Sequence, residues 1–197
     1  MATRRLSIVL IAALAIFAAC STPGMAVTSQ TSSTNGPELS GEQIQQVVAL
    51  HNKYRARHGA PPLTWDSGLA LLAGGHAGRC KFEHSGLRYG ENIAVGHSPD
   101  VGLSDMWYST EVCNYNWANP SFNAGHFTQV VWDKTTKIGC ALAGQSSCPN
   151  GIVWPGGKAL FMLVCEYDPP GNFPDFAAHV GRAVDEAALN RDCGRSG

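Results

Sequence analysis

The chain has 197 residues, with 14 lysines and arginines against 15 aspartates and glutamates, so its formal net charge at pH 7 is −1. Because no basic patch is apparent, this balance argues against nucleic acid as a partner. Seven cysteines in a chain of this size are typical of an exported domain that is held together by disulfides.

The N-terminus has the pattern of a secretory signal. Arg4 and Arg5 precede an apolar run over residues 6–19, which is shorter than the roughly 20 residues of a membrane-spanning helix. A small-x-small site at 24–26 predicts a signal peptide over residues 1–26, followed by a flexible Ser/Thr-rich leader over 27–39 and a single domain over 40–197. The residues up to Cys20 also resemble a bacterial lipobox, so the alternative is a lipid anchor on Cys20.

Three helices are predicted in the first part of the domain. Ser40 and Gln43 form a capping-box pattern at the start of the first helix, and Asp66 is the candidate cap of the second. The third has proline at its first helical position, and Glu111 follows Trp107 by one turn on it. The expected helices cover residues 40–58, 66–76 and 98–111.

The pattern then changes to strands, which are expected over residues 128–132, 138–142 and 158–167. Val, Thr, Phe and Trp favour a packed, pleated surface, so the stretch GHFTQVVW predicts a strand with His126 just before its start. Because side chains alternate along a strand, His126 is expected on the same face as Thr128, Val130 and Trp132. The apolar run 160–164 indicates a strand buried on both faces, with helices covering both sides of a mostly antiparallel sheet. Residues 176–189 have modest helical character.

Four segments together resemble the successive signatures of the CAP superfamily, which comprises cysteine-rich secretory proteins, venom antigen 5 and plant pathogenesis-related protein 1. The segments are HSGLRYGENIA (84–94), MWYSTEV (106–112), GHFTQVVWDKTTKIGC (125–140) and FMLVCEYDPPGNF (161–173). The resemblance extends over residues 44–173. It implies an α+β fold, a disulfide-bonded three-layer α-β-α sandwich with a mostly antiparallel central sheet.

The resemblance also implies that two histidines and two glutamates converge in a central cleft. By motif position these residues are His84, Glu91, Glu111 and His126. Two imidazoles with carboxylate oxygens suit zinc or a similar divalent ion, and nearby carboxylates raise imidazole pKa values. The structural alternative is a hydrogen-bonded cluster that ties the helices to the sheet, with no required cofactor.

Catalysis is the third interpretation of this cluster and has less support in the sequence. The chain contains no H-E-x-x-H zinc-protease motif and no G-x-S-x-G nucleophile elbow. Most CAP proteins have no established enzymatic activity. We therefore expect a protein that is not an enzyme, and we keep a His/Glu metal-dependent hydrolase as an alternative.

A second constellation lies in the loop 115–122. Tyr115, Trp117 and Phe122 are spaced aromatic-x-aromatic-x₄-aromatic, with Pro120 between the last two. The pattern resembles the loop of fungal CAP proteins that bind and export sterols. It suggests a mobile loop that covers an apolar ligand. Ordinary packing of the loop onto the domain is the structural alternative.

The six cysteines outside the signal region permit several pairings. The family resemblance implies Cys140–Cys165 and Cys80–Cys148, after which Cys113 and Cys193 remain as the third pair. The resemblance further implies a secreted protein whose partner is a sterol or a fatty-acid-like hydrophobic ligand, with contact to a membrane surface; no protein partner is indicated. A secreted defence or virulence effector that acts on another organism's membranes or proteins is the alternative function.

Overall fold

The computed structural model describes residues 37–98 and 100–194, which all belong to one compact unit spanning Thr34–Gly197. The predicted signal peptide, Cys20 and most of the predicted leader lie outside the described residues. Within these two ranges, no helix has the length and apolar character needed to cross a membrane.

The unit contains both helices and strands. The helices are α1 Gly41–Arg57, α2 Ser67–Ala77, α3 Leu103–Ser109, α4 Gly125–Val131, α5 Phe176–His179 and α6 Glu186–Asp192, with short 3₁₀ turns η1 Val112–Asn114 and η2 Phe122–Ala124. The strands are β1 Thr64–Trp65, β2 Gly90–Gly96, β3 Lys137–Ala143, β4 Ile152–Trp154, β5 Gly157–Ala159 and β6 Phe161–Asp168.

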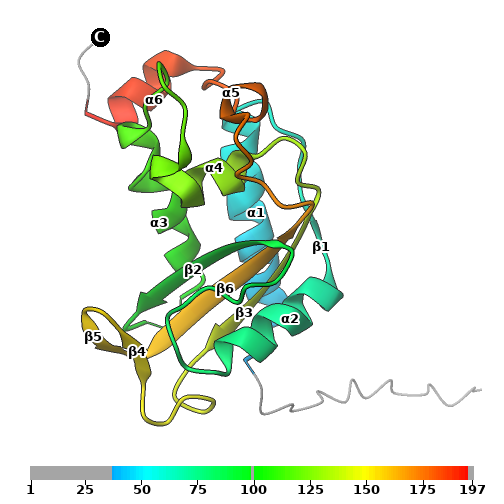
Figure 1. Cartoon of the computed structure of the whole chain (residues 1–197), viewed down its shortest axis with the longest axis vertical. Coiled ribbons are helices and arrows are strands. Elements are labelled where there is room, and N and C mark those ends of the chain that lie inside the picture. Colours follow the sequence, from blue (N-terminus) through cyan, green and yellow to red (C-terminus); the bar gives the residue numbers. More distant parts are fainter. Residues whose placement is uncertain (1–36, 99, 195–197) are drawn as a thin grey trace, which may run out of the picture. The chain divides into compact units, whose positions relative to one another are not determined.

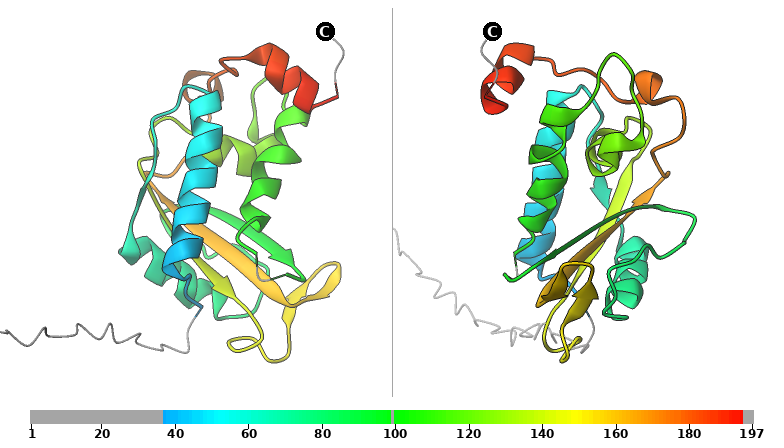
Figure 2. Two further views of the ribbon diagram at one scale, coloured as in Figure 1. Left: turned by 180° about the vertical axis from the view of Figure 1, so that it is seen from behind. Right: turned by 60° about the vertical axis from the view of Figure 1, so that its left-hand side comes forward.

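The main sheet forms the middle of three layers (Figure 1). Its strand order is β1-β3-β6-β2, in which β1 runs parallel to β3 and the other neighbours are antiparallel. α2 covers one face, and α1, α3 and α4 pack together on the other, as the turned view in Figure 2 shows. This arrangement confirms the expected α+β fold with helices on both sides of a mostly antiparallel sheet.

The predicted starts of the first two helices are confirmed. The Gln43 N–H donates to Ser40 Oγ at 3.2 Å and the Ser40 N–H donates to Gln43 Oε1 at 2.9 Å, so both bonds of the capping box form. Asp66 Oδ1 accepts the N–H groups of Gly68 and Leu69 at the start of α2. These caps satisfy backbone donors that have no partner inside a helix.

The prediction for GHFTQVVW was wrong, because this stretch forms the helix α4 and not a strand. The reason lies in Arg55 of α1, whose buried guanidinium donates to the carbonyls of Val130 and Trp132 at 3.0 and 2.8 Å. These bonds satisfy carbonyls at the end of α4 that a helix leaves unpaired. Burial and this contact outweigh the strand preference of the β-branched residues.

Three other elements differ from the sequence prediction. α3 spans Leu103–Ser109 instead of the predicted 98–111, so it starts later than expected and Glu111 lies beyond its end, at the start of η1. The predicted strand 158–167 is divided between β5 and β6 at Leu160. The C-terminal segment forms two short helices instead of one. The sequence analysis also missed β2, which forms an edge of the main sheet and pairs with β6.

Three disulfides connect these elements, and their pairs are those expected above. Cys140–Cys165 joins β3 to β6, Cys80–Cys148 joins the end of α2 to the loop after β3, and Cys113–Cys193 joins η1 to the end of α6. The last bridge ties the C-terminal segment to the α1–α3–α4 layer, and the first lies between strands that already pair in register.

Candidate functional site

The first polar pair is formed by His84 and Glu91 on the α2 side of the sheet. His84 Nδ1 lies 2.6 Å from Glu91 Oε1, and the Ser85 N–H donates to both carboxylate oxygens at 3.0 and 3.2 Å. Glu91 is placed by β2, where it lies opposite Glu166 of β6. His76 of α2 approaches the same carboxylate at 3.8 Å.

This cluster contains two carboxyl groups with opposite electrostatics. Burial raises the pKa of Glu91, but the hydrogen bonds from His84 and Ser85 outweigh it and lower the pKa to about 2. Burial, together with the neighbouring Glu91, raises the pKa of Glu166 to about 8. The hydrogen bond to Glu91 raises the pKa of His84. At neutral pH, Glu91 is therefore ionised and Glu166 is protonated.

The sequence analysis missed Glu166 because it lies inside an apolar strand with no polar pattern around it. Its side chain is fully buried, and Oε2 has no hydrogen-bond partner within the described part of the chain. Ser85 Oγ donates to Oε1 at 3.4 Å. The motif CEYDPPGN contained this residue, but only the pairing of β2 with β6 brings it to Glu91.

The second polar pair is formed by Glu111 and His126 at the start of α4. His126 Nδ1 lies 2.6 Å from Glu111 Oε1, and the Phe127 N–H donates to Glu111 Oε2 at 2.9 Å. The imidazole stacks on the ring of Trp107, with the centroids 6.3 Å apart. Glu111 therefore holds both the histidine and the first turn of the helix that carries it.

The two pairs approach the edge strand β2 from its two faces. Glu91 and Asn92 are consecutive, so their side chains point to opposite faces, and Asn92 Nδ2 donates to the carbonyl of His126 at 3.1 Å. Across residues 37–98 and 100–194, no group of three or more His, Cys, Asp or Glu side chains is arranged to hold a metal ion. The convergence of all four residues in one cleft stays a prediction.

The two histidines each have a ring nitrogen that could bind a divalent ion. His84 and His126 each use Nδ1 to contact a carboxylate, which leaves Nε2 as the ligand atom. Metal-binding histidines commonly have such a carboxylate on the other ring nitrogen, where it orients the imidazole. Glu91 and Glu111 are therefore placed to orient the histidines.

The aromatic loop 115–122 is anchored in the core at two of its three aromatic rings. Tyr115 is buried and Trp117 is partly buried, and both contact Phe127 edge to face, at centroid distances of 5.2 and 6.1 Å. Phe122 is 64% exposed and Pro120 is partly exposed. The Tyr115 hydroxyl is buried without a hydrogen-bond partner in the described residues. Packing therefore accounts for Tyr115 and Trp117, and Phe122 is the ring that faces solvent.

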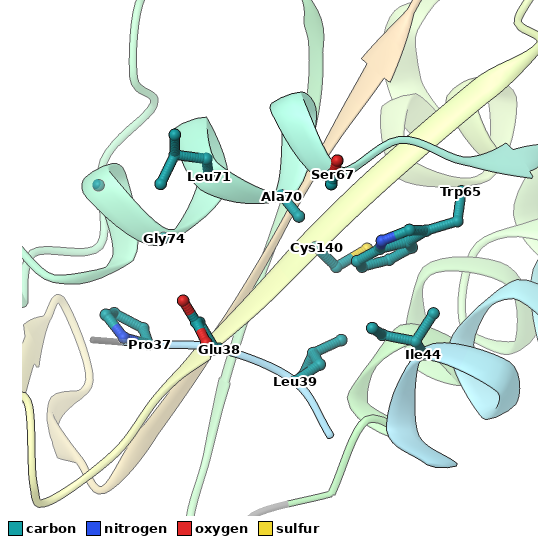
Figure 3. A pocket seen from close by; sticks show the side chains of 11 residues that line it. Pro37, Glu38, Leu39, Ile44, Trp65, Ser67, Ala70, Leu71, Gly74 and Cys140 are labelled. Carbon is teal, nitrogen blue, oxygen red and sulfur yellow. The ribbon is translucent and has the colours of Figure 1, made fainter. Parts of the chain in front are cut away.

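A cavity of about 600 Å³ lies at the edge of the sheet beside β3, between the Pro37–Leu39 segment, α1 and α2 (Figure 3). Most of its lining is apolar, including Leu39, Ile44 and Trp65. This cavity was not predicted from the sequence. The available signal was the run of small residues in α2.

Comparison with known proteins gives consistent similarities. The family model described as "Cysteine-rich secretory protein family" (CAP) matches residues 48–167. The Candida albicans "Secreted protein RBT4" is 37% identical over 158 residues, which make up 75% of this chain and 41% of that protein. "Pathogenesis-related protein 1" of Arabidopsis thaliana is 37% identical over 145 residues, or 70% of this chain and 83% of that protein.

Solved structures show the same fold at lower identity. Venom allergen-like protein 4 of Schistosoma mansoni is 24% identical, with a TM-score of 0.53, over 76% of this chain and 99% of that chain. The crystal structure of NaASP2 with Zn²⁺ is 21% identical, with a TM-score of 0.53, over 74% of this chain and 85% of that one. At this level of identity the likeness shows the fold alone.

Proposed function

Because the chain belongs to the cysteine-rich secretory protein (CAP) family, we propose that it is a secreted, non-enzymatic protein that binds a sterol or another small hydrophobic lipid. The observation that carries this proposal is the loop 115–122. Tyr115 and Trp117 anchor the loop in the core, and Phe122 presents an apolar ring to solvent. An anchored loop of this kind contacts an apolar ligand at little cost in conformational entropy.

The driving force is the removal of apolar surface from water. Burial stabilises a complex by about 25 cal/mol per Å² of apolar area. Phe122 is among the most exposed large apolar side chains of the described residues, and its ring lies over Gly125, where an added Cβ would approach the phenyl carbons to 3.0 Å. Gly125 therefore leaves room for the Phe122 ring beside α4.

The contacts around His84 and Ser85 do not favour hydrolysis by a serine nucleophile. A serine nucleophile needs a base within hydrogen-bond reach, but Ser85 Oγ accepts the Leu87 N–H and donates to Glu166 instead of contacting His84. A zinc ion, if bound, would be held by Nε2 of His84 and His126, and it would supply Lewis-acid chemistry there. Because no third His, Cys, Asp or Glu of residues 37–98 and 100–194 is grouped for metal binding, we propose that such binding is weak.

Extracellular localisation is supported by the name of the relative, Secreted protein RBT4, and by the three disulfides, which persist in oxidising compartments. Contact with a membrane surface follows if the lipid is loaded from a bilayer. The lipid anchor on Cys20 has no support among the relatives.

Radiolabelled cholesterol binding to the secreted chain tests the proposal. Phe122→Ala should weaken binding about tenfold or more, because it removes an exposed apolar contact without disturbing the core. Val153→Ala, which removes a comparably exposed apolar side chain on β4, is the matched control and should bind as the parent protein does. Absence of cholesterol binding by the parent protein, or an equal affinity of Phe122→Ala and the control, would contradict the loop as the lipid contact.

A further inference from the structure

We propose that the cavity between Pro37–Leu39, α1 and α2 is a second ligand site, and that it takes an uncharged lipid with one hydroxyl group. The cavity has a volume of about 600 Å³, within the range of roughly 300–1,000 Å³ for small-molecule sites. It lies beside β3 at the edge of the sheet, between α1 and α2, and shares no lining residue with the loop 115–122. This inference is independent of the function proposed for that loop.

One wall of the cavity is a single face of α2. The lining residues Ser67, Ala70, Leu71, Gly74 and Gly75 follow the i, i+3, i+4, i+7, i+8 spacing of one helical face. Four of these five side chains are small. The other face of α2 packs on the sheet through Leu69, Ala73 and Ala77, which are buried. The small residues therefore leave space on a face that is not needed for the core.

The opposite wall is set by the start of α1. Leu39 and Ile44 occupy the positions on either side of the Ser40 capping box at which apolar residues commonly pack together, and both line the cavity. Pro37 closes the end of the wall, because its carbonyl lies only 3.1 Å from the position of an added Cβ at Gly74. The capping box thus holds the Pro37–Leu39 segment in place as a wall.

The floor exists because β1 is short. β1 pairs with β3 only at Thr64–Lys137 and Trp65–Ile138, after which the chain turns into α2. The part of β3 beyond Ile138 has no strand beside it on this edge, and Cys140 faces the cavity there. Trp65, the last residue of β1, supplies a large apolar ring beside Cys140 (Figure 3).

The charge of the lining selects the class of ligand. Glu38 is the one charged residue among the lining residues, and it has no hydrogen bond or ion pair to another described residue. Its carboxylate extends from the Pro37–Leu39 segment toward α2 (Figure 3). An anionic head group such as a fatty acid carboxylate would be repelled there, whereas a hydroxyl group would donate a hydrogen bond to it. The hydroxyl of Ser67 is a second polar group in the lining.

A matched pair of fluorescent probes tests both parts of this proposal on the full chain. Parinaryl alcohol and parinaric acid differ only in the head group. At pH 7 the alcohol should bind at least fivefold more tightly than the acid, and Glu38→Gln should reduce this ratio at least threefold by strengthening the binding of the acid. Energy transfer from tryptophan to the bound alcohol should fall in Trp65→Phe, which places the probe in the cavity.

Two variants that fill the cavity provide the structural test. Ala70→Phe and Gly75→Leu should each weaken parinaryl alcohol binding at least tenfold; an added Cβ at Gly75 meets no atom within 4 Å, so this change suits the fold. Leu72→Phe, on the same helix but outside the lining, is the control and should bind normally. Loss of alcohol binding in Phe122→Ala with full binding in Gly75→Leu would overturn the cavity site and leave the proposed loop function standing. No alcohol binding by the parent chain, or equal affinities for both probes, would also overturn it.

Discussion

Glu91 of β2 and Glu166 of β6 lie opposite each other in the sheet and are ionised to different extents at neutral pH. His84 and Ser85 stabilise the charge on Glu91, whereas Glu166 is fully buried and keeps its proton, with a pKa of about 8. This pairing makes the stability of the fold depend on pH in two directions.

The first prediction concerns stability above pH 4.5. The unfolded chain loses the Glu166 proton near pH 4.5 while the folded chain keeps it to about pH 8, so the free energy of unfolding falls as pH rises through this window. The raised pKa of His84 adds to this fall, because its stabilisation is lost as pH rises above 6.5 through the folded pKa. Below pH 4.5, protonation of Glu91 destabilises the fold as pH falls toward 2.

In the parent protein we expect the free energy of unfolding to fall by on the order of 2–4 kcal/mol between pH 5 and pH 8. Glu166→Gln should remove most of this fall. Urea denaturation at several pH values measures it. Glu83→Gln, at an exposed glutamate nearby, is the control. Its free energy of unfolding should change with pH as that of the parent protein does. A Glu166→Gln slope equal to that of the control would show that the buried carboxyl does not keep its proton.

The second prediction concerns Arg55. Its guanidinium is fully buried and donates to four carbonyls, those of Pro61, Val130, Trp132 and Thr135. A lysine in Arg55→Lys cannot reach all four carbonyls, so some buried carbonyls lose their donors. The free energy of unfolding should therefore fall by about 3 kcal/mol or more. Arg57→Lys, at an exposed ion pair with Asp192, should change stability by less than about 1 kcal/mol. Equal melting temperatures for the two variants would refute this assignment.

The third prediction separates anchoring from ligand contact in the aromatic loop. Trp117 packs against Tyr115 and Phe127, so Trp117→Ala should lower the free energy of unfolding by about 2–3 kcal/mol. Phe122→Ala should change it by less than about 0.5 kcal/mol, because that ring faces solvent. Thermal melting of both variants measures this ranking. The opposite ranking would mean that Phe122, and not Trp117, anchors the loop.

The fourth prediction concerns metal. Calorimetric titration with Zn²⁺ should give weak binding of about one ion per chain, and His84→Ala and His126→Ala should each abolish it, because we propose that both imidazoles are ligands. Asp133 and His179 form a similar pair elsewhere, at 2.7 Å, so His179→Ala is a matched control. Zinc uptake that survives in both His84→Ala and His126→Ala would place the ion at another site.

Local signals in the sequence predicted the parts of the fold that depend on neighbouring residues. The cap residues Ser40 and Asp66 begin helices as expected, because their side chains bond to backbone groups two or three residues away. α4 could not be predicted in this way, since its last carbonyls are satisfied by Arg55, which lies 75 residues earlier than Val130. The same limit applies to Glu166, because only the pairing of β2 with β6 places it against Glu91.

The candidate sites also differ in whether a local sequence motif or the folded chain reveals them. The pairs His84–Glu91 and Glu111–His126 were named as site residues from motif positions, and each pair is joined by a 2.6 Å contact. The cavity beside α2 arises from a short strand, a capped helix start and small side chains that are distant in the sequence. No single motif encodes that combination, so the cavity could be found only in the folded chain.

The most direct measurement of the central claim is the lipid content of the protein itself. The full chain should be purified from the medium of cells that secrete it, extracted with organic solvent and analysed for sterols and other neutral lipids. Our account predicts lipid in an amount approaching one molecule for each of the two proposed sites, and a clear reduction in Phe122→Ala and in Gly75→Leu. A content no higher than that of an unrelated secreted protein purified in the same way, with no uptake of added cholesterol, would contradict it.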